Sequence, residues 1–70
     1  MTRFSKLREL LTLARSLENE AKSMTGQGHW DRRSLADEYR AKAEWITGRI
    51  DDAEYNSRLC EAADVRANPV

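Results

Sequence analysis

The chain has 70 residues and a mass of 8.1 kDa, and its twelve Lys and Arg residues balance twelve Asp and Glu residues. This length allows one small domain and is too short for a cofactor-binding α/β enzyme, in which one βαβ unit alone takes about 30 residues or more. Hydrophobic residues make up 40% and charged residues 34%, which is too apolar for a disordered tail and too polar for a membrane span. Because the net charge is zero, no overall field attracts the chain to nucleic acid or to an anionic membrane.

The cysteine content and the first residues indicate the compartment. Cys60 is the single cysteine, so an intrachain disulfide is excluded. A secreted domain of this size usually depends on disulfides or on a metal. The first twenty residues contain no apolar run long enough for the core of a signal peptide, and their acidic residues argue against a transit peptide. We therefore expect a cytoplasmic protein.

The spacing of apolar residues predicts a first helix over residues 5–24. These residues alternate spacings of three and four, which is the pattern of a helix seam: Leu7, Leu10, Ala14, Leu17, Ala21 and Met24. With Leu11 and Leu13 the apolar arc covers roughly 180°, more than a surface helix needs. Gly26 is expected to end the helix in a left-handed conformation. We expect this long amphipathic helix to occupy the centre of the domain.

A second helix is predicted over residues 32–47, after a turn formed by residues 25–30, TGQGHW. Asp31 is expected to cap this helix, and Trp30 with Leu35 is expected to form a hydrophobic staple across its start. One narrow stripe of this helix carries Leu35, Tyr39, either Lys42 or Ala43, and Ile46.

The clearest local signal is the start of a third helix, predicted over residues 52–65. Asp51 stands at the N-cap position and Glu54 follows three residues later, as in a capping box. Gly48 is expected to end the preceding helix, which leaves room only for a tight corner. The second and third helices are therefore expected to be antiparallel or crossed neighbours. Residues 66–70 are expected to form a frayed tail.

No segment shows the alternation of a β-strand. The sequence therefore predicts one all-α domain over residues 1–70, either a small three-helix bundle or a helical hairpin with a short third helix, and we expect it to self-associate. The stretch from Gly48 to Leu59, GRIDDAEYNSRL, resembles the helix corner of short C-terminal oligomerisation modules of the SHOCT type. The resemblance covers twelve residues, and no function is transferred from it.

The reactive side chains form no recognisable catalytic or metal-binding set. His29 and Cys60 are the only good soft ligands, whereas a structural zinc site needs four. A nucleophilic Cys60 would need His29 as its base and a third group to orient the imidazole. Paired carboxylates such as Asp51 and Asp52 would need a deep cleft for glycosidase chemistry, which three short helices cannot enclose. We expect no enzyme, no cofactor and no metal.

Nucleic-acid binding through the basic start of the second helix is the alternative function. A helix–turn–helix protein presents such a helix to the DNA groove, and the bases concerned are Arg32, Arg33, Arg40 and Lys42. Acidic residues are interleaved with these bases and would face the phosphates. Two i,i+4 ion pairs of a solvated helix are also expected: Arg40 with Glu44, and Glu38 with Lys42. The alternative is therefore a small nucleic-acid-binding transcriptional regulator.

Association with another protein is the leading hypothesis. Trp30 and Trp45 are typical of interface hot spots. Trp45 lies roughly 80° from the stripe of the second helix, so it is either an interface anchor or a boundary residue. We expect a small non-enzymatic interaction module, a regulator or inhibitor that docks on a larger protein as an adaptor, an antagonist or a mobile-element-encoded inhibitor. Its expected contact residues are Leu10, Leu13, Leu17, Met24, Trp30 and Trp45.

The expected partners are a protein of unknown identity and a second copy of the chain, with a homodimer as the favoured form. Residues 1–15 hold four bases and one acid, whereas residues 50–70 hold two bases and five acids. This polarity suits antiparallel docking of the first helix of one copy on the third helix of another. It also suits pairing of the two helices within one bundle.

Overall fold

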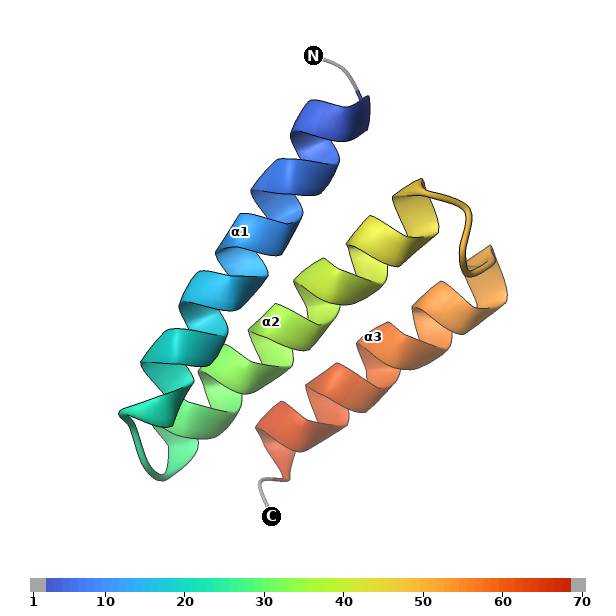
Figure 1. The fold of residues 1–70 in the computed structure, drawn as a ribbon. Helices are drawn as coiled ribbons and strands as arrows, with labels where there is room; N and C mark the ends of the chain where they lie inside the picture. The colour runs from blue at the N-terminus through green and yellow to red at the C-terminus, as the bar shows by residue number, and fades with distance from the viewer. Residues whose placement is uncertain (1–2, 69–70) are drawn as a thin grey trace.

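Three antiparallel helices lie side by side, with the second helix in the middle (Figure 1). The computed structural model describes residues 3–68, with side chains from Ser5 to Asn68. Helix α1 spans Arg3–Lys22, α2 spans Gln27–Ile46 and α3 spans Asp52–Ala67. No strand occurs in residues 3–68, so the all-α prediction is confirmed. Residues 69–70 of the expected tail lie outside the described residues.

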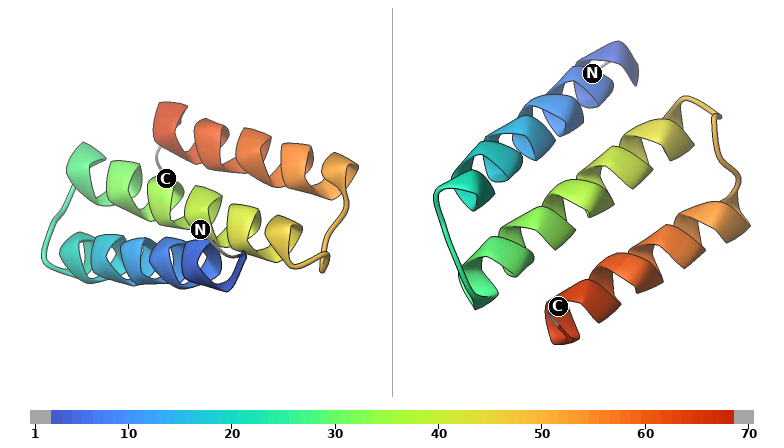
Figure 2. Two further views of the ribbon diagram at one scale, coloured as in Figure 1. Left: turned by 90° about the horizontal axis from the view of Figure 1, so that it is seen from above. Right: turned by 60° about the horizontal axis from the view of Figure 1, so that its bottom comes forward.

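The order of packing differs from the expectation that the first helix is central. α2 packs against both α1 and α3, whereas α1 and α3 make no contact with each other within the described residues. The view from above shows the same order, with α2 between its two neighbours (Figure 2). The basic first helix and the acidic third helix therefore do not pair inside one chain.

Small residues on two opposite sides of α2 explain its central place. Ala36 and Ala43 are buried on the side that packs against α1, and Ser34 and Ala41 are buried on the opposite side. Ser34 Oγ accepts a hydrogen bond of 3.2 Å from the Arg66 guanidinium of α3. Because small side chains let helix axes approach closely, α2 can hold a neighbour on each side.

The corner between α2 and α3 forms as the sequence predicts. Gly48 has φ +77°, which a residue with a Cβ rarely adopts, and it follows the end of α2. Asp51 is the N-cap of α3, and its carboxylate accepts a hydrogen bond of 2.8 Å from the Glu54 backbone N–H. The predicted third helix start is thus confirmed, while its end at Ala67 lies beyond the expected residue 65.

The start of α2 differs from the prediction. The helix begins at Gln27, so most of the expected turn is helical, and Trp30 lies in the first turn rather than before the helix. Gly26 is its N-cap, with φ +70° and no side-chain hydrogen bond to the helix. Asp31 is therefore an interior residue, and it accepts a hydrogen bond of 2.8 Å from the Gln27 side chain. Gly26 does adopt positive φ, but it begins α2 instead of ending α1, which stops at Lys22.

The buried core is small because it consists mainly of alanines. The residues with 3% exposure or less are Leu10, Ala14, Ala21, Ser34, Ala36, Ala41, Ala43 and Ala62. The Cα atoms span 36 × 24 × 14 Å, and within the described residues α1 and α3 make no contact, so the three helices form a row and not a ring around a shared core. The accessible surface of 5005 Å² exceeds the roughly 4,500 Å² expected for a monomeric globular protein of this mass. The chain thus forms one layer of helices with both broad faces open.

Ion pairs link α2 to each neighbour instead of forming within α2. The interhelical pairs are Glu18 with Arg40 at 2.5 Å, Glu20 with Arg32 at 3.1 Å, Glu38 with Arg66 at 2.5 Å, and Glu44 with Arg58. The expected i,i+4 pairs of α2 were therefore wrong. The reason is that the neighbouring helices place opposite charges beside each of these side chains, which a local pattern in one helix does not show.

Candidate functional site

Helix α2 divides the layer into two broad faces. One of its sides packs on α1 and the opposite side packs on α3, as the ion pairs of Arg40 and Glu38 show. At about 100° per residue, the two remaining sides of α2 face away from both neighbours. One carries Leu35, Tyr39 and Ile46 together with Lys42, and the other carries Arg33, Asp37 and Glu44.

The first of these sides belongs to a face that we call the apolar face. Helical spacing places further apolar residues of α1 and α3 on the same side of the layer, and the face consists of Leu13, Leu17, Met24, Leu35, Tyr39, Ile46 and Leu59. All of these are half-buried except Leu13, which is 39% exposed. These residues come from all three helices and from the segment between α1 and α2. In that segment the methyl group of Met24 packs on Gly28, where an added Cβ would be 2.6 Å from it.

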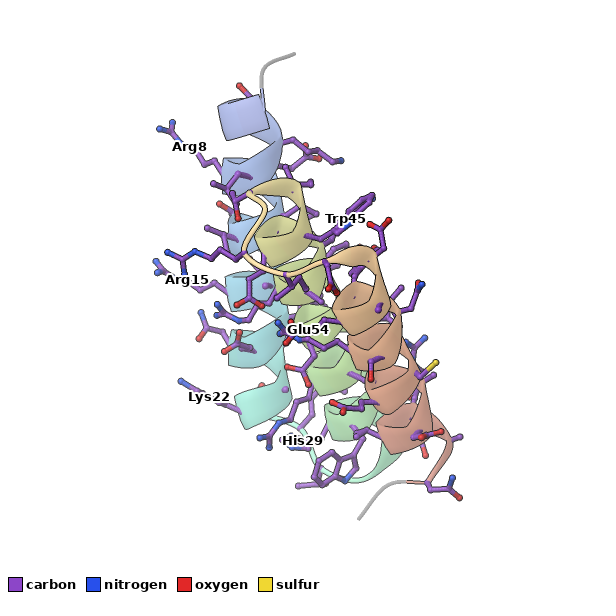
Figure 3. The ribbon with its side chains drawn as sticks, turned by 90° about the vertical axis from the view of Figure 1, so that its right-hand side faces the viewer. Arg8, Arg15, Lys22, His29, Trp45 and Glu54 are labelled. Carbon is purple, nitrogen blue, oxygen red and sulfur yellow. The ribbon has the colours of Figure 1, made fainter. Side chains whose placement is uncertain are left out.

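Trp45 links α2 to the start of α3. Its ring stacks on Tyr55 with centroids 4.7 Å apart and planes 6° from parallel. Its Nε1–H donates a hydrogen bond of 2.6 Å to the Asp52 carboxylate. Trp45 remains 39% exposed, and in the edge-on view it projects from the side opposite to the basic residues of α1 (Figure 3). Trp45 therefore joins the two helices at their corner and stays partly exposed there.

The opposite side of the layer is the charged face. Arg8, Arg15 and Lys22 project from α1 on this side (Figure 3) and form what we call the basic column. They are seven residues apart, so neighbouring members are separated by about 10 Å along the helix. The other charged residues of the face come from α2 and α3: Arg33, Asp37, Glu44, Arg58 and Glu61.

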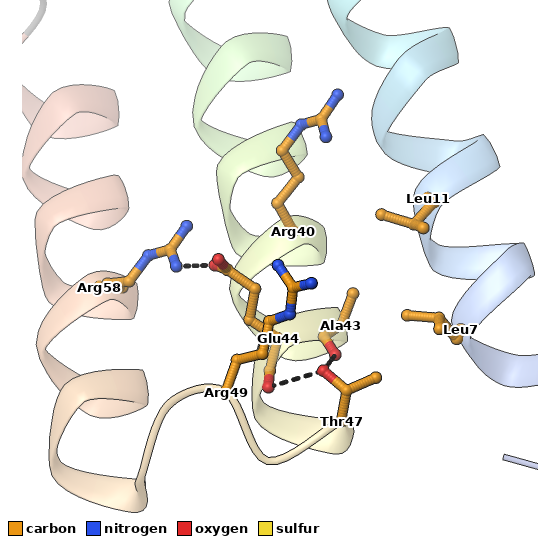
Figure 4. A pocket seen from close by; sticks show the side chains of 8 residues that line it. All are labelled: Leu7, Leu11, Arg40, Ala43, Glu44, Thr47, Arg49 and Arg58. Atoms are coloured by element: carbon orange, nitrogen blue, oxygen red, sulfur yellow. Dashed lines mark hydrogen bonds and ion pairs between the residues drawn. The ribbon is translucent and has the colours of Figure 1, made fainter. Parts of the chain in front are cut away.

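A groove of about 400 Å³ lies on the charged face, between α1 and the C-terminal half of α2. Leu7 and Leu11 of α1 form one wall (Figure 4). The groove is lined by Leu7, Leu11, Arg40, Ala43, Glu44, Thr47, Arg49 and Arg58. The Arg58 guanidinium pairs with Glu44, and Thr47 Oγ1 donates a hydrogen bond of 3.0 Å to the Ala43 carbonyl. The groove thus combines an apolar wall with three guanidinium groups.

The predicted contact residues occupy three different places. Leu10 is 2% exposed and belongs to the core, so it is not accessible to a partner. Leu13, Leu17 and Met24 lie together on the apolar face. Trp30 packs instead at the start of α2, where its ring meets His29 edge-on at 4.9 Å and lies 5.6 Å beneath the Arg33 guanidinium carbon.

The bases proposed to contact nucleic acid are not gathered into one patch. Arg40 pairs with Glu18, and Arg32 pairs with Glu20. By helical spacing, Arg33 and Arg40 lie on the charged side of α2 whereas Arg32 and Lys42 lie toward the apolar face. The arrangement therefore gives no specific support for a DNA-reading helix.

His29 and Cys60 are not combined with further ligands. His29 Nδ1 lies 2.7 Å from the Ala21 carbonyl oxygen, which ties the start of α2 to the end of α1. Cys60 is exposed on α3. Among residues 3–68, no group of three or more His, Cys, Asp or Glu side chains is arranged to hold a metal ion.

Some candidate residues were missed by sequence reasoning. The spacing of Leu35, Tyr39 and Ile46 predicts a buried stripe, whereas in the structure these residues are half-buried on an open face. The heptad spacing of Ala36 with Ala43 was the signal that α2 packs through its small residues. For Arg49 and Arg58 in the groove, the sequence offered no local signal, since they come from a corner and from a different helix.

Comparisons with known proteins add nothing to this geometry. No family model, curated protein or solved structure matches the chain. The likeness of residues 48–59 to SHOCT modules therefore rests on the capped helix corner alone. In residues 3–68, no helix has both the length and the hydrophobicity needed to cross a bilayer.

Proposed function

We propose that the chain is a small non-enzymatic protein–protein interaction module that associates with a second copy through its apolar face. The observation that carries this proposal is the open single layer. A stable domain usually packs two layers around its core, and this chain supplies one layer, whose core is mostly alanine. A second layer would cover the apolar residues that α1, α2 and α3 leave half-buried.

The apolar face suits an isologous dimer, in which the same patch of each copy meets its counterpart. An isologous dimer would place α2 of each copy at the centre of the interface, with Tyr39 of each copy near the symmetry axis. Lys42 beside it can lay its aliphatic stem along apolar surface and keep its ammonium group in water.

A module of this kind acts by occupying a surface of a larger protein. The small size of the domain is consistent with a regulator or inhibitor. In this proposal the dimer is the working unit, because it buries the apolar faces and leaves the two charged faces outward. The nucleic-acid alternative is not proposed, since its bases lie on different sides of α2.

Two leucines of α1 provide a matched test of self-association. Leu13 is 39% exposed on the apolar face, and Leu11 is 41% exposed on the opposite side of the same helix. We expect sedimentation equilibrium at about 100 µM to give twice the chain mass of 8.1 kDa for the wild type. Leu13→Glu should shift the mass toward the monomer, because it buries a charge in the interface, whereas Leu11→Glu should remain dimeric.

Circular dichroism of both variants checks that the helices persist. A wild-type chain that remains monomeric at about 100 µM would refute the dimer. Equal effects of the two substitutions would show that the apolar face is not the interface.

A further inference from the structure

The groove on the charged face is a second surface, separate from the proposed dimer interface. Leu7 and Leu11 line this groove and also line a second hollow on the outer side of α1. Arg8 and Arg15 line that second hollow. The two leucines therefore form a short apolar ridge between the hollows, with cationic residues on both sides.

The charge around this ridge is strongly unbalanced. Among the described side chains, five arginines line the two hollows, Arg8, Arg15, Arg40, Arg49 and Arg58, together with one carboxylate, that of Glu44. Glu44 pairs with Arg58, and Arg40 pairs with Glu18 of α1. Within the described residues, the Arg49 guanidinium makes no ion pair. The chain has no net charge, so this local excess of positive charge is a property of the folded arrangement.

The apolar ridge distinguishes between two kinds of anionic ligand, nucleic acid and an acidic protein surface. Nucleic acid bound without sequence preference takes up backbone charge and stacks its bases on aromatic rings. Among the residues from Ser5 to Asn68, whose side chains the structure describes, none that lines either hollow is aromatic. Leu7, Leu11 and Ala43 instead offer contacts to aliphatic side chains. Arg49 offers a planar donor pair that matches a carboxylate. A ligand that satisfies both features carries apolar residues and carboxylates on one surface.

We propose that the groove binds an acidic amphipathic helix of a partner protein. The apolar side chains of that helix pack on Leu7 and Leu11, in the helix-in-groove mode. Its carboxylates face Arg49 on one side and the arginines of α1 on the other. Arg8 and Arg15 are one heptad apart, so acidic residues at heptad spacing on the ligand would stand opposite both.

The test uses the full chain and two synthetic peptides of about four helical turns. The first peptide carries Leu at its a and d positions and Glu at e and g, and the second has Lys in place of each Glu. Fluorescence anisotropy of the labelled peptides measures their binding. We expect the Glu peptide to bind at least about tenfold more tightly than the Lys peptide, and its binding to weaken as ionic strength rises from about 0.05 to about 0.5 M.

Charge-matched variants locate the peptide. Arg49→Glu should weaken binding of the Glu peptide by about tenfold or more, because it removes a charge-assisted contact and adds repulsion. Arg33→Glu makes the same charge change on the charged face away from the groove, and it should have little effect. Arg49 lies in the exposed corner after α2, so its replacement should leave the helical circular dichroism unchanged.

Three results would overturn the proposal. Equal binding of the two peptides would remove the role of charge. Tighter binding of a short DNA duplex than of the Glu peptide at the same salt concentration would assign the arginines to nucleic acid. Loss of peptide binding with Leu13→Glu but not with Arg49→Glu would place the peptide on the apolar face. Because these measurements are made on peptide binding, they are independent of whether the chain dimerises.

Discussion

The contact of Trp45 with Tyr55 and Asp52 makes a quantitative prediction about the α2–α3 corner. Trp45→Phe keeps an aromatic ring but removes the N–H that donates to Asp52 at 2.6 Å. Tyr55→Leu removes the ring that stacks on Trp45 at 4.7 Å. Trp45→Phe therefore reports on the hydrogen bond, and a double-mutant cycle of Trp45→Leu with Tyr55→Leu reports on the stack.

The expected energies follow from the two contacts. A hydrogen bond contributes about 0.5–1.5 kcal/mol net, and because Trp45 is 39% exposed, we expect Trp45→Phe to cost about 1 kcal/mol or less. An aromatic pair adds about 0.5–1.5 kcal/mol beyond the burial of its area. A cycle built with Trp45→Leu and Tyr55→Leu should therefore show a coupling of about 0.5–1 kcal/mol. In a domain of this size, a loss of 1 kcal/mol lowers Tm by about 4–8 °C.

The assay is urea unfolding followed by circular dichroism of the helices, because fluorescence would change with the tryptophan itself. All variants are compared at one protein concentration, since self-association makes stability depend on concentration. A coupling below about 0.3 kcal/mol, which is within the error of additivity, would refute the claim that the stack joins the two helices.

Three further predictions concern the cap residue Asp51 and two glycines. Asp51→Ala should destabilise the domain by about 1 kcal/mol because it removes the side-chain acceptor for the Glu54 N–H, whereas Asp51→Asn should lose only a few tenths; thermal unfolding measures both, and equal Tm values for wild type and Asp51→Ala would contradict the cap. Gly48→Ala should cost about 1 kcal/mol because of its positive φ alone, since an added Cβ meets nothing within 4 Å. Gly28→Ala should be close to neutral because the obstructing atom is the flexible end of Met24; a larger loss at Gly28 than at Gly48 would reverse this reasoning.

A structural feature was predictable from the sequence when the residues that form it are close neighbours along the chain. The start of α3 depends on Asp51 and on an N–H three residues away, so a short pattern was sufficient. The start of α2 has no side-chain cap. In the sequence, Asp31 is a better N-cap candidate than Gly26. In the structure, α2 begins earlier, at Gln27, where His29 contacts the end of α1.

The packing order was not predictable from the width of the apolar arcs. The first helix has the widest arc, which favours a central place for α1 and an inward-facing Leu35–Tyr39–Ile46 stripe. The structure instead packs α2 through Ala36 and Ala43 on one side and through small residues on the other. Close approach of helix axes favours small side chains at the contact, and the larger ones are left on an open face.

The central position of α2 explains how the equal numbers of acidic and basic residues are paired. α2 turns arginines toward the glutamates of α1 and glutamates toward the arginines of α3, so much of the charge is neutralised between helices. The remaining side chains are distributed unevenly over the two broad sides. One side carries the apolar face, and the other carries an excess of arginine around the groove. If two copies join through their apolar faces, their grooves lie on opposite outer sides of the dimer. A partner with one acidic helix would then bind each side independently, and bivalent binding would require a linker long enough to pass around both layers.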